Sequence, residues 1–167
     1  MVPLRPGSMS MRPVHVTTRA LDRREMESLL SRHHVGRLAA SFEDRHSLTL
    51  VNYTYADGWI YLRIEAGERR TTIEHHPWVA FEVDEIDGIY DWRTVTVHGP
   101  VQFLTDDPHS SAWRDFHTAV QLIRSVVPGA RTSEDPMPDR VHLFRIYVDT
   151  ITGTEARSDA RDVLPAP

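Results

Sequence analysis

Apolar and polar residues alternate along much of the chain, and this period-two pattern predicts β-strands. The pattern is clearest on the two sides of Ala56-Asp57-Gly58, where aromatic and β-branched residues alternate with polar ones. Two such runs around Asp-Gly are typical of antiparallel strands joined by a tight turn. We therefore expect a β-hairpin here. In all, the pattern predicts six strands, at residues 37–42, 48–55, 58–65, 78–84, 92–104 and 140–150.

Three helices are predicted between these strands. The first begins at Asp22, which forms a capping box with Glu25, and we expect Gly36 to end it. A second, of about two turns, follows Gly67 and stops before Pro77. A third is expected from Asp107-Pro108 to Val127. Most strands are joined by turns too short for crossover helices, so the sequence predicts a mostly β fold, a six-stranded antiparallel barrel with flanking helices.

Composition limits the number of domains and the classes of function that fit the chain. The 167 residues, 40% of them apolar, suffice for one domain, which we place at residues 18–154 between a flexible arm at 1–17 and a polar tail at 155–167. The chain has no cysteine, no apolar window of membrane-spanning length and no leader peptide, so we expect a cytoplasmic protein with no membrane contact. A net charge of −5 without a long basic run disfavours nucleic-acid binding.

All 19 basic residues are arginines, and the chain contains no lysine. Schiff-base chemistry through the protein is therefore excluded, and any bound phosphate must be held by arginine, backbone N–H or hydroxyl groups. Arg69 and Arg70 follow the hairpin at the start of the second helix, where free N–H groups and the helix dipole favour an anion. The alternative is that they form surface ion pairs with Glu68 or Glu74.

At this point several short pieces, in order along the chain, resemble the pyridoxamine 5′-phosphate oxidase-like flavoproteins, which include the nitroimidazole-resistance reductases. That family has the FMN-binding split β-barrel, so the resemblance implies this fold over roughly residues 20 to 150. The matching pieces lie at residues 35–39, 51–53, 57–61, 67–69, 77–84 and 92–99.

The resemblance implies a set of cofactor contacts. Arg69 aligns with the basic residue that holds the FMN phosphate, with Arg70 as its helper. Asn52 occupies a position that contacts the ribityl chain or the phosphate, and Thr49, on the opposite strand face, is a weaker candidate. Arg63, which we place on an outward strand face with Tyr61, either adds a phosphate contact, shapes the substrate side or is simply an exposed arginine.

Two further candidates lie at the start of the long strand. In relatives this segment approaches the flavin, often from the partner subunit, so Trp92 would wall the ring and Thr94 would lie near it. An ordinary core role for Trp92 is equally compatible with the sequence. We expect a homodimer with cofactor sites at its interface, built on the long strand and an apolar face around Trp113 and Phe116.

These observations favour an FMN-dependent reductase or oxidase of a small molecule. Flavin chemistry does not require a catalytic acid or base from the protein, so no catalytic residue is assigned. A deazaflavin-dependent reductase is one alternative, and a flavin- or haem-binding protein without turnover is another. No histidine spacing indicates a metal site. The basic, aromatic C-terminal motif of genuine pyridoxamine phosphate oxidases is poorly matched at residues 140–149, which leaves the substrate open.

Overall fold

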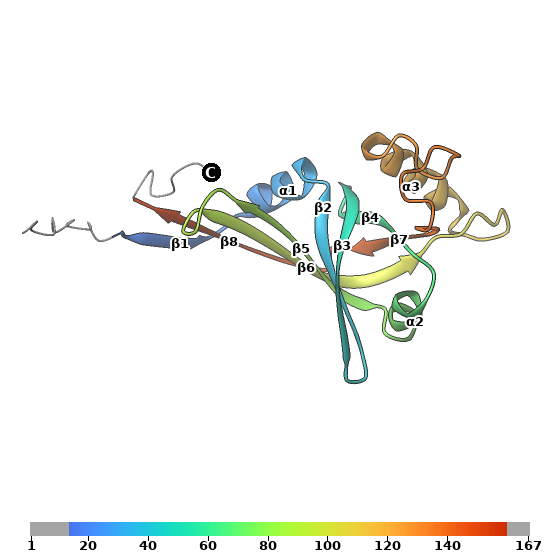
Figure 1. The fold of residues 1–167 in the computed structure, drawn as a ribbon, viewed down its shortest axis with the longest axis horizontal. Coiled ribbons are helices and arrows are strands. Elements are labelled where there is room, and N and C mark those ends of the chain that lie inside the picture. The colour runs from blue at the N-terminus through green and yellow to red at the C-terminus, as the bar shows by residue number, and fades with distance from the viewer. Residues whose placement is uncertain (1–13, 160–167) are drawn as a thin grey trace, which may run out of the picture.

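The computed structural model describes residues 14–159, except for the side chains of Phe42, Arg45, Glu68 and Arg69. Within these residues the chain forms strands and three helices in a single connected sheet arrangement (Figure 1). In chain order the elements are β1 (Val16–Ala20), α1 (Arg23–Arg32), β2 (Val35–Phe42), β3 (Arg45–Ala56), β4 (Trp59–Ile64), α2 (Glu68–His75), β5 (Trp78–Ile86), β6 (Trp92–Phe103), α3 (Trp113–Val126), β7 (His142–Tyr147) and β8 (Thr150–Ser158).

Six of the strands close into an antiparallel barrel. The strand order is β1-β8-β6-β5-β2-β3-β4-β7, and a further pairing of β6 with β7 closes the ring formed by β2 to β7. Strand β6 is long enough to serve two partners, because its first half pairs with β8 and its last residues pair with β7. The predicted mostly β fold and six-stranded antiparallel barrel are thus confirmed.

The sheet extends beyond the barrel on one side. Strand β8 pairs with β6, and β1 pairs with β8, so these strands form an arm with the ends of β5 and β6 (Figure 1). Val16 and Thr17 therefore belong to a strand although we expected a flexible arm through residue 17, and β8 continues to Ser158 although we expected a polar tail from residue 155. Residues 1–13 and 160–167, the rest of those two predicted segments, lie outside the described residues.

The predicted hairpin is present as β3 and β4. Ala56 pairs with Trp59 across the turn, and Asp57 and Gly58 both have positive φ angles, of 50° and 79°. Two successive positive φ angles characterise the turn whose twist matches that of the flanking strands, which explains the Asp-Gly sequence.

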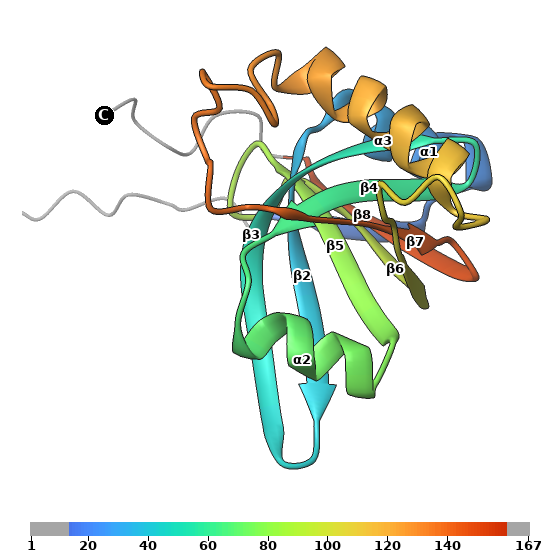
Figure 2. The ribbon, with the colours of Figure 1, turned by 90° about the vertical axis from the view of Figure 1, so that its right-hand side faces the viewer.

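Two separate hydrophobic cores hold the fold together. The first fills the barrel, where Leu29 and Leu30 of α1 and Ile73 of α2 are fully buried among strand residues such as Phe81 and Phe144. The second lies outside the barrel, where Phe116, Ala119 and Ile123 of α3 pack with Tyr61 and Leu143. Figure 2 shows α3 and α2 at opposite ends of the strands. Phe116 is therefore buried within its own chain, which corrects its expected place on an exposed dimer face.

Helix boundaries differ from expectation at two places. The capping box of Asp22 and Glu25 is confirmed, but α1 ends at Arg32, and Gly36 lies in β2. A Cβ at Gly36 would lie 2.3 Å from the Phe81 ring, so close packing rather than helix termination requires glycine there. Helix α3 begins at Trp113 because Asp107 instead caps an isolated turn, accepting a hydrogen bond from the His109 N–H at 2.9 Å.

The three described helices are all too short and too polar to span a membrane.

Candidate functional site

The backbone N–H groups at the amino end of α2 are not capped by any described side chain. Its N-cap is Gly67, with φ +123°, and no side chain caps the helix. None of the described side chains therefore accepts a hydrogen bond from the first-turn N–H groups, and the helix dipole adds positive potential at the same place. Arg69 lies in this turn, but its side chain is outside the described part of the structure, so its predicted phosphate contact stays a prediction.

Arg70 is engaged by its own chain. Its Nε donates to Glu74 Oε1 at 2.7 Å, and its Nη1 lies 2.9 Å from His142 Nδ1. The Arg70 Cζ lies 5.5 Å from the centre of the Phe103 ring. Burial, together with the charge of Arg70, lowers the pKa of His142 below its ordinary value, which keeps the imidazole neutral and able to accept a hydrogen bond. The ion pair of Arg70 with Glu74, which was the alternative to a phosphate contact, is present, and the phosphate contact stays a prediction.

Arg63 forms a buried ion pair. It is 5% exposed, and its two Nη atoms donate to the two carboxylate oxygens of Asp135, with one of these bonds at 3.1 Å. Asp135 also accepts the backbone N–H of Arg131 at 2.6 Å and of Met137 at 3.0 Å. The expectation of an exposed strand arginine is wrong, because the segment after α3 covers this face of β4.

Asn52 lies beside this pair and is also bonded to the segment after α3. Its side-chain oxygen accepts from Arg140 Nη1 at 3.1 Å, and a small cavity is lined by Asn52, Arg63, Arg140 and residues of α3. Thr49 pairs with Leu38, whereas Asn52 pairs with Val35, so the two side chains point to opposite faces of β3 as predicted. The structure therefore brings Asn52 and Arg63 together but not Thr49.

Trp92 and Thr94 line a different depression, the β5–β6 hollow. It measures about 770 Å³ including the space open to solvent, and it is lined by Glu82, Asp84, Ile86, Gly88, Ile89, Trp92, Arg93 and Thr94. The Oγ1 atom of Thr94 is buried and has no hydrogen-bond partner among the described residues. Trp92 is half-buried in this wall and belongs to neither hydrophobic core, so the alternative of an ordinary core role does not apply.

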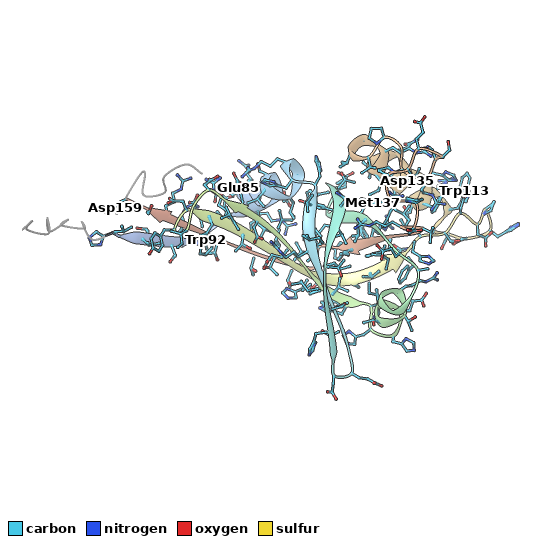
Figure 3. All side chains as sticks on the ribbon, in the orientation of Figure 1. Glu85, Trp92, Trp113, Asp135, Met137 and Asp159 are labelled. Atoms are coloured by element: carbon cyan, nitrogen blue, oxygen red, sulfur yellow. The ribbon has the colours of Figure 1, made fainter. Side chains whose placement is uncertain are left out.

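Two of the candidate pairs, Trp92 with Thr94 and Asn52 with Arg63, lie far apart. Figure 3 shows Trp92 on the arm of the sheet and Asp135, the partner of Arg63, beyond the barrel on the other side. One compact ligand bound to a single protomer cannot reach both groups.

Arg70 also stands apart from Arg63. Ile64, the neighbour of Arg63, is paired with His142, and Arg70 contacts His142. Because neighbouring strand residues point to opposite faces, Arg63 and Arg70 approach β4 from opposite sides.

Sequence reasoning missed the partners that the segment after α3 supplies. Asp135 and Arg140 lie in a stretch without hydrophobic periodicity that we assigned to a loop, and no local signal connects them with strands 70 to 90 positions earlier. Glu82 in the β5–β6 hollow was missed as well, although period two on β5 places it with Asp84 on the outer face.

Metal binding has no support in residues 14–159. No group of three or more histidine, aspartate or glutamate side chains among them is arranged to hold a metal ion.

Known structures share this fold over most of their length. A FAD-binding protein from Mesorhizobium loti is 24% identical, with a TM-score of 0.67, over 86% of this chain and 99% of that chain. A FAD-binding protein from Mycobacterium smegmatis is 19% identical, with a TM-score of 0.60, over 83% and 98%. A candidate 5-nitroimidazole antibiotic resistance protein from Bacteroides thetaiotaomicron is 15% identical, with a TM-score of 0.64, over 90% and 97%. At these identities the likeness establishes the fold.

A family model identifies the chain more closely. Among curated proteins none matches the sequence. The model of the pyridoxamine 5′-phosphate oxidase family, however, matches residues 22–155, which span α1, the whole barrel and most of β8. The chain therefore belongs to the pyridoxamine 5′-phosphate oxidase family.

Proposed function

We propose that this protein is an FMN-binding oxidoreductase that acts on a small molecule. The observation that carries the proposal is the family match over residues 22–155, in which the hairpin leads directly into the uncapped start of α2. Two solved structures with the same fold are described as FAD-binding proteins, which supports a flavin as the ligand.

The residues at the start of α2 suit a phosphate. The uncapped first turn offers backbone N–H groups, Gly67 leaves the approach open because none of the described residues beyond its chain neighbours lies within 4 Å of where its Cβ would be, and Arg69 and Arg70 supply positive charge. Arg63 and Asn52 fit less directly, because their polar groups are already bonded to Asp135 and Arg140. Arg69 is therefore the principal phosphate ligand in this proposal.

A bound flavin would supply hydride transfer, and the protein would position it and exclude water. Trp92 and Thr94 are proposed to border the ring end of the cofactor. A cofactor whose phosphate lies at the α2 start of the same protomer would not reach these two residues. Trp92 offers an aromatic surface, and the unpartnered hydroxyl of Thr94 offers a hydrogen bond.

We propose a two-fold homodimer that brings the α2 start of one protomer beside Trp92 and Thr94 of the other. The outer face of β2 and β3 exposes Val35 by 55%, Leu48 by 70% and Leu50 by 60%, and the register places all three on one face. No helix of the described chain packs on them. A second copy would cover this apolar surface and set its own β5–β6 hollow beside the α2 start.

Spectroscopy of the purified protein tests the cofactor. Bound FMN gives oxidised-flavin bands in the blue, a deazaflavin absorbs nearer the violet, and haem gives a Soret band. Titration of flavin-free protein with FMN, FAD and riboflavin then ranks the ligands, and we expect FMN to bind most tightly. A folded protein that binds none of the three would refute the proposal.

A further inference from the structure

The small cavity that Asn52 lines contains both apolar and basic side chains. The carboxyl end of α3 and its capping residue supply the apolar part, with Ile123, Val126 and Val127. Arg63 and Arg140 supply the basic part, and the cavity measures about 270 Å³ including the space open to solvent. An apolar lining with a few convergent polar groups is typical of a binding site for a small organic molecule.

Arg140 differs from the other mostly buried arginines of the described chain in its charge partner. The side chains of Arg63 and Arg145 are 6% and 13% exposed, and each donates to an aspartate, at 3.1 Å and 2.6 Å. The side chain of Arg140 is 17% exposed, yet its one ion-pair partner among the described residues is Glu65, 3.9 Å from Nε and 53% exposed. A mostly buried charge without a close counter-charge is costly, and a bound anion would supply that counter-charge.

The hydrogen bonds of Arg140 leave donors for such an anion. Nη1 donates to Asn52 Oδ1 at 3.1 Å and Nη2 to the Leu50 carbonyl oxygen at 3.4 Å, so two uncharged acceptors take two of its five N–H groups. Because the Asn52 oxygen faces Arg140, the amide nitrogen of Asn52 is also a donor, and none of the described residues accepts from it. A guanidinium and an amide N–H side by side are suitable partners for a carboxylate.

We propose that this cavity binds a small organic carboxylate. The carboxylate would accept hydrogen bonds from Arg140 and the Asn52 amide, and its apolar part would lie against the residues at the end of α3. An organic cation is disfavoured, because Arg63 and Arg140 bring two positive charges and Asp135 cancels one of them. A single uncompensated guanidinium beside apolar residues suits a monoanion with an apolar group better than a phosphate dianion. The inference goes beyond the proposed function and does not rest on it, because Arg140 and the α3 residues are not among the proposed flavin contacts.

Three probes of nearly the same shape test the ligand class. The anion benzoate, the uncharged benzamide and the cation benzamidinium are titrated calorimetrically into the full-length protein, with and without FMN. We expect benzoate to bind at least about tenfold more tightly than benzamide, since a hydrogen bond to a charged group contributes about that much. Benzamidinium should bind most weakly. FMN should not compete with benzoate, whereas competition would assign the cavity to the phosphate of the cofactor.

Two arginine variants locate the interaction. Arg140→Gln should weaken benzoate about tenfold and leave benzamide unchanged. Arg145→Gln is the matched control, because Arg145 is buried to a similar degree but already donates to Asp115 at 2.6 Å. It should change neither affinity.

Glu65→Gln tests the same charge balance from the opposite direction. The variant removes the carboxylate nearest to Arg140 and leaves the proposed donors in place. Benzoate should then bind more tightly, by up to about fivefold, which is the range of an exposed ion pair. This variant also decides the matter where Arg140→Gln does not fold, because an unchanged or weaker benzoate affinity would count against the site.

The outcomes separate this inference from the proposed function. If FMN fails to bind while benzoate binds and responds to Arg140→Gln, the flavin proposal fails and the carboxylate site stands. The inference is overturned if the folded protein binds benzoate no more tightly than benzamide, if FMN displaces benzoate, or if Arg140→Gln and Arg145→Gln have the same effect.

Discussion

Arg63 and Asp135 are 72 positions apart in sequence, yet they form a two-bond ion pair with side chains only 6% and 4% exposed. Asp135 also accepts two backbone N–H groups of its own loop, so one carboxylate fastens the segment after α3 to the outer face of β4. Arg63 lines the same small cavity as Asn52.

Removal of the carboxylate charge should therefore be strongly destabilising. Asp135→Asn leaves the Arg63 guanidinium buried without a counter-charge, and breaking a buried pair in this way costs about 3–5 kcal/mol. Urea unfolding followed by circular dichroism measures the loss. The control is Glu134→Gln, because Glu134 is the exposed neighbour. A loss below 1 kcal/mol for Asp135→Asn, on the scale of an exposed pair, would contradict the structure.

Because of His142, we expect the free energy of unfolding to depend on pH. Its pKa is lowered from 6.5 in the folded chain by burial and by Arg70, so the unfolded chain binds a proton more readily. Stability from this group is fully present above about pH 6.5 and falls as the pH drops from there through the lowered pKa.

The variant His142→Asn keeps an acceptor for Arg70 without the titration. Between about pH 7.5 and pH 5, its unfolding free energy should fall less than that of the wild type. Equal pH dependence of the two proteins would show that His142 titrates normally in the folded state.

The sequence predicted the barrel because its signals are local. Alternation on β3 and β4, the Asp-Gly turn and the Asp22 capping box each act over a few residues, and all three are present. Gly36 was misread for the same reason. Glycine after a helix usually ends it, but here the Phe81 ring, 45 positions away, requires the missing side chain.

The candidate site was less predictable because long-range partners decide the role of a polar side chain. Alternation places Arg63 on the outer face of β4 but cannot reveal that α3 and Asp135 cover it. The hydrogen bond from Arg140 to Asn52 likewise joins residues 88 positions apart. In contrast, Trp92 and Thr94 lie together in one hollow because they are two residues apart on one strand, a relation that period two supplies.

Thr94→Val should separate a ligand-binding hydroxyl from a structural one. Because Oγ1 has no partner among the described residues, replacing it with a methyl group removes an unsatisfied polar atom. The free energy of unfolding should stay unchanged or rise by up to about 1 kcal/mol. Affinity for FMN should fall in the same protein, because this hydroxyl is proposed to border the flavin ring. A clear loss of stability would reveal an internal partner for this hydroxyl.

Leu50→Arg should disrupt the proposed dimer. Leu50 is 60% exposed on the outer face of β3, and a charge there would be buried without a partner at a two-fold contact. Light scattering at micromolar concentration should give twice the 19.2 kDa chain mass for the wild type and the chain mass for the variant.

Tyr147→Arg provides the control for that experiment. Tyr147 is also exposed, by 44%, but it lies on β7, which pairs with β4 and β6 and not with β2 or β3. It should remain dimeric. A wild-type protein that is monomeric with flavin bound would refute the interface.

Arg69→Ala tests the phosphate end of the cofactor. If Arg69 binds the FMN phosphate beside the uncapped start of α2, its loss leaves a dianion held by backbone N–H groups and Arg70. Hydrogen bonds to charged groups contribute about 1.5–3 kcal/mol, so FMN affinity should fall roughly 10- to 150-fold. Riboflavin lacks the phosphate, so it should bind the wild type weakly and respond little to the substitution. Because unfolding would weaken both ligands alike, the ratio of the two affinities is the decisive measurement. An unchanged ratio in a folded variant would assign Arg69 to a surface role.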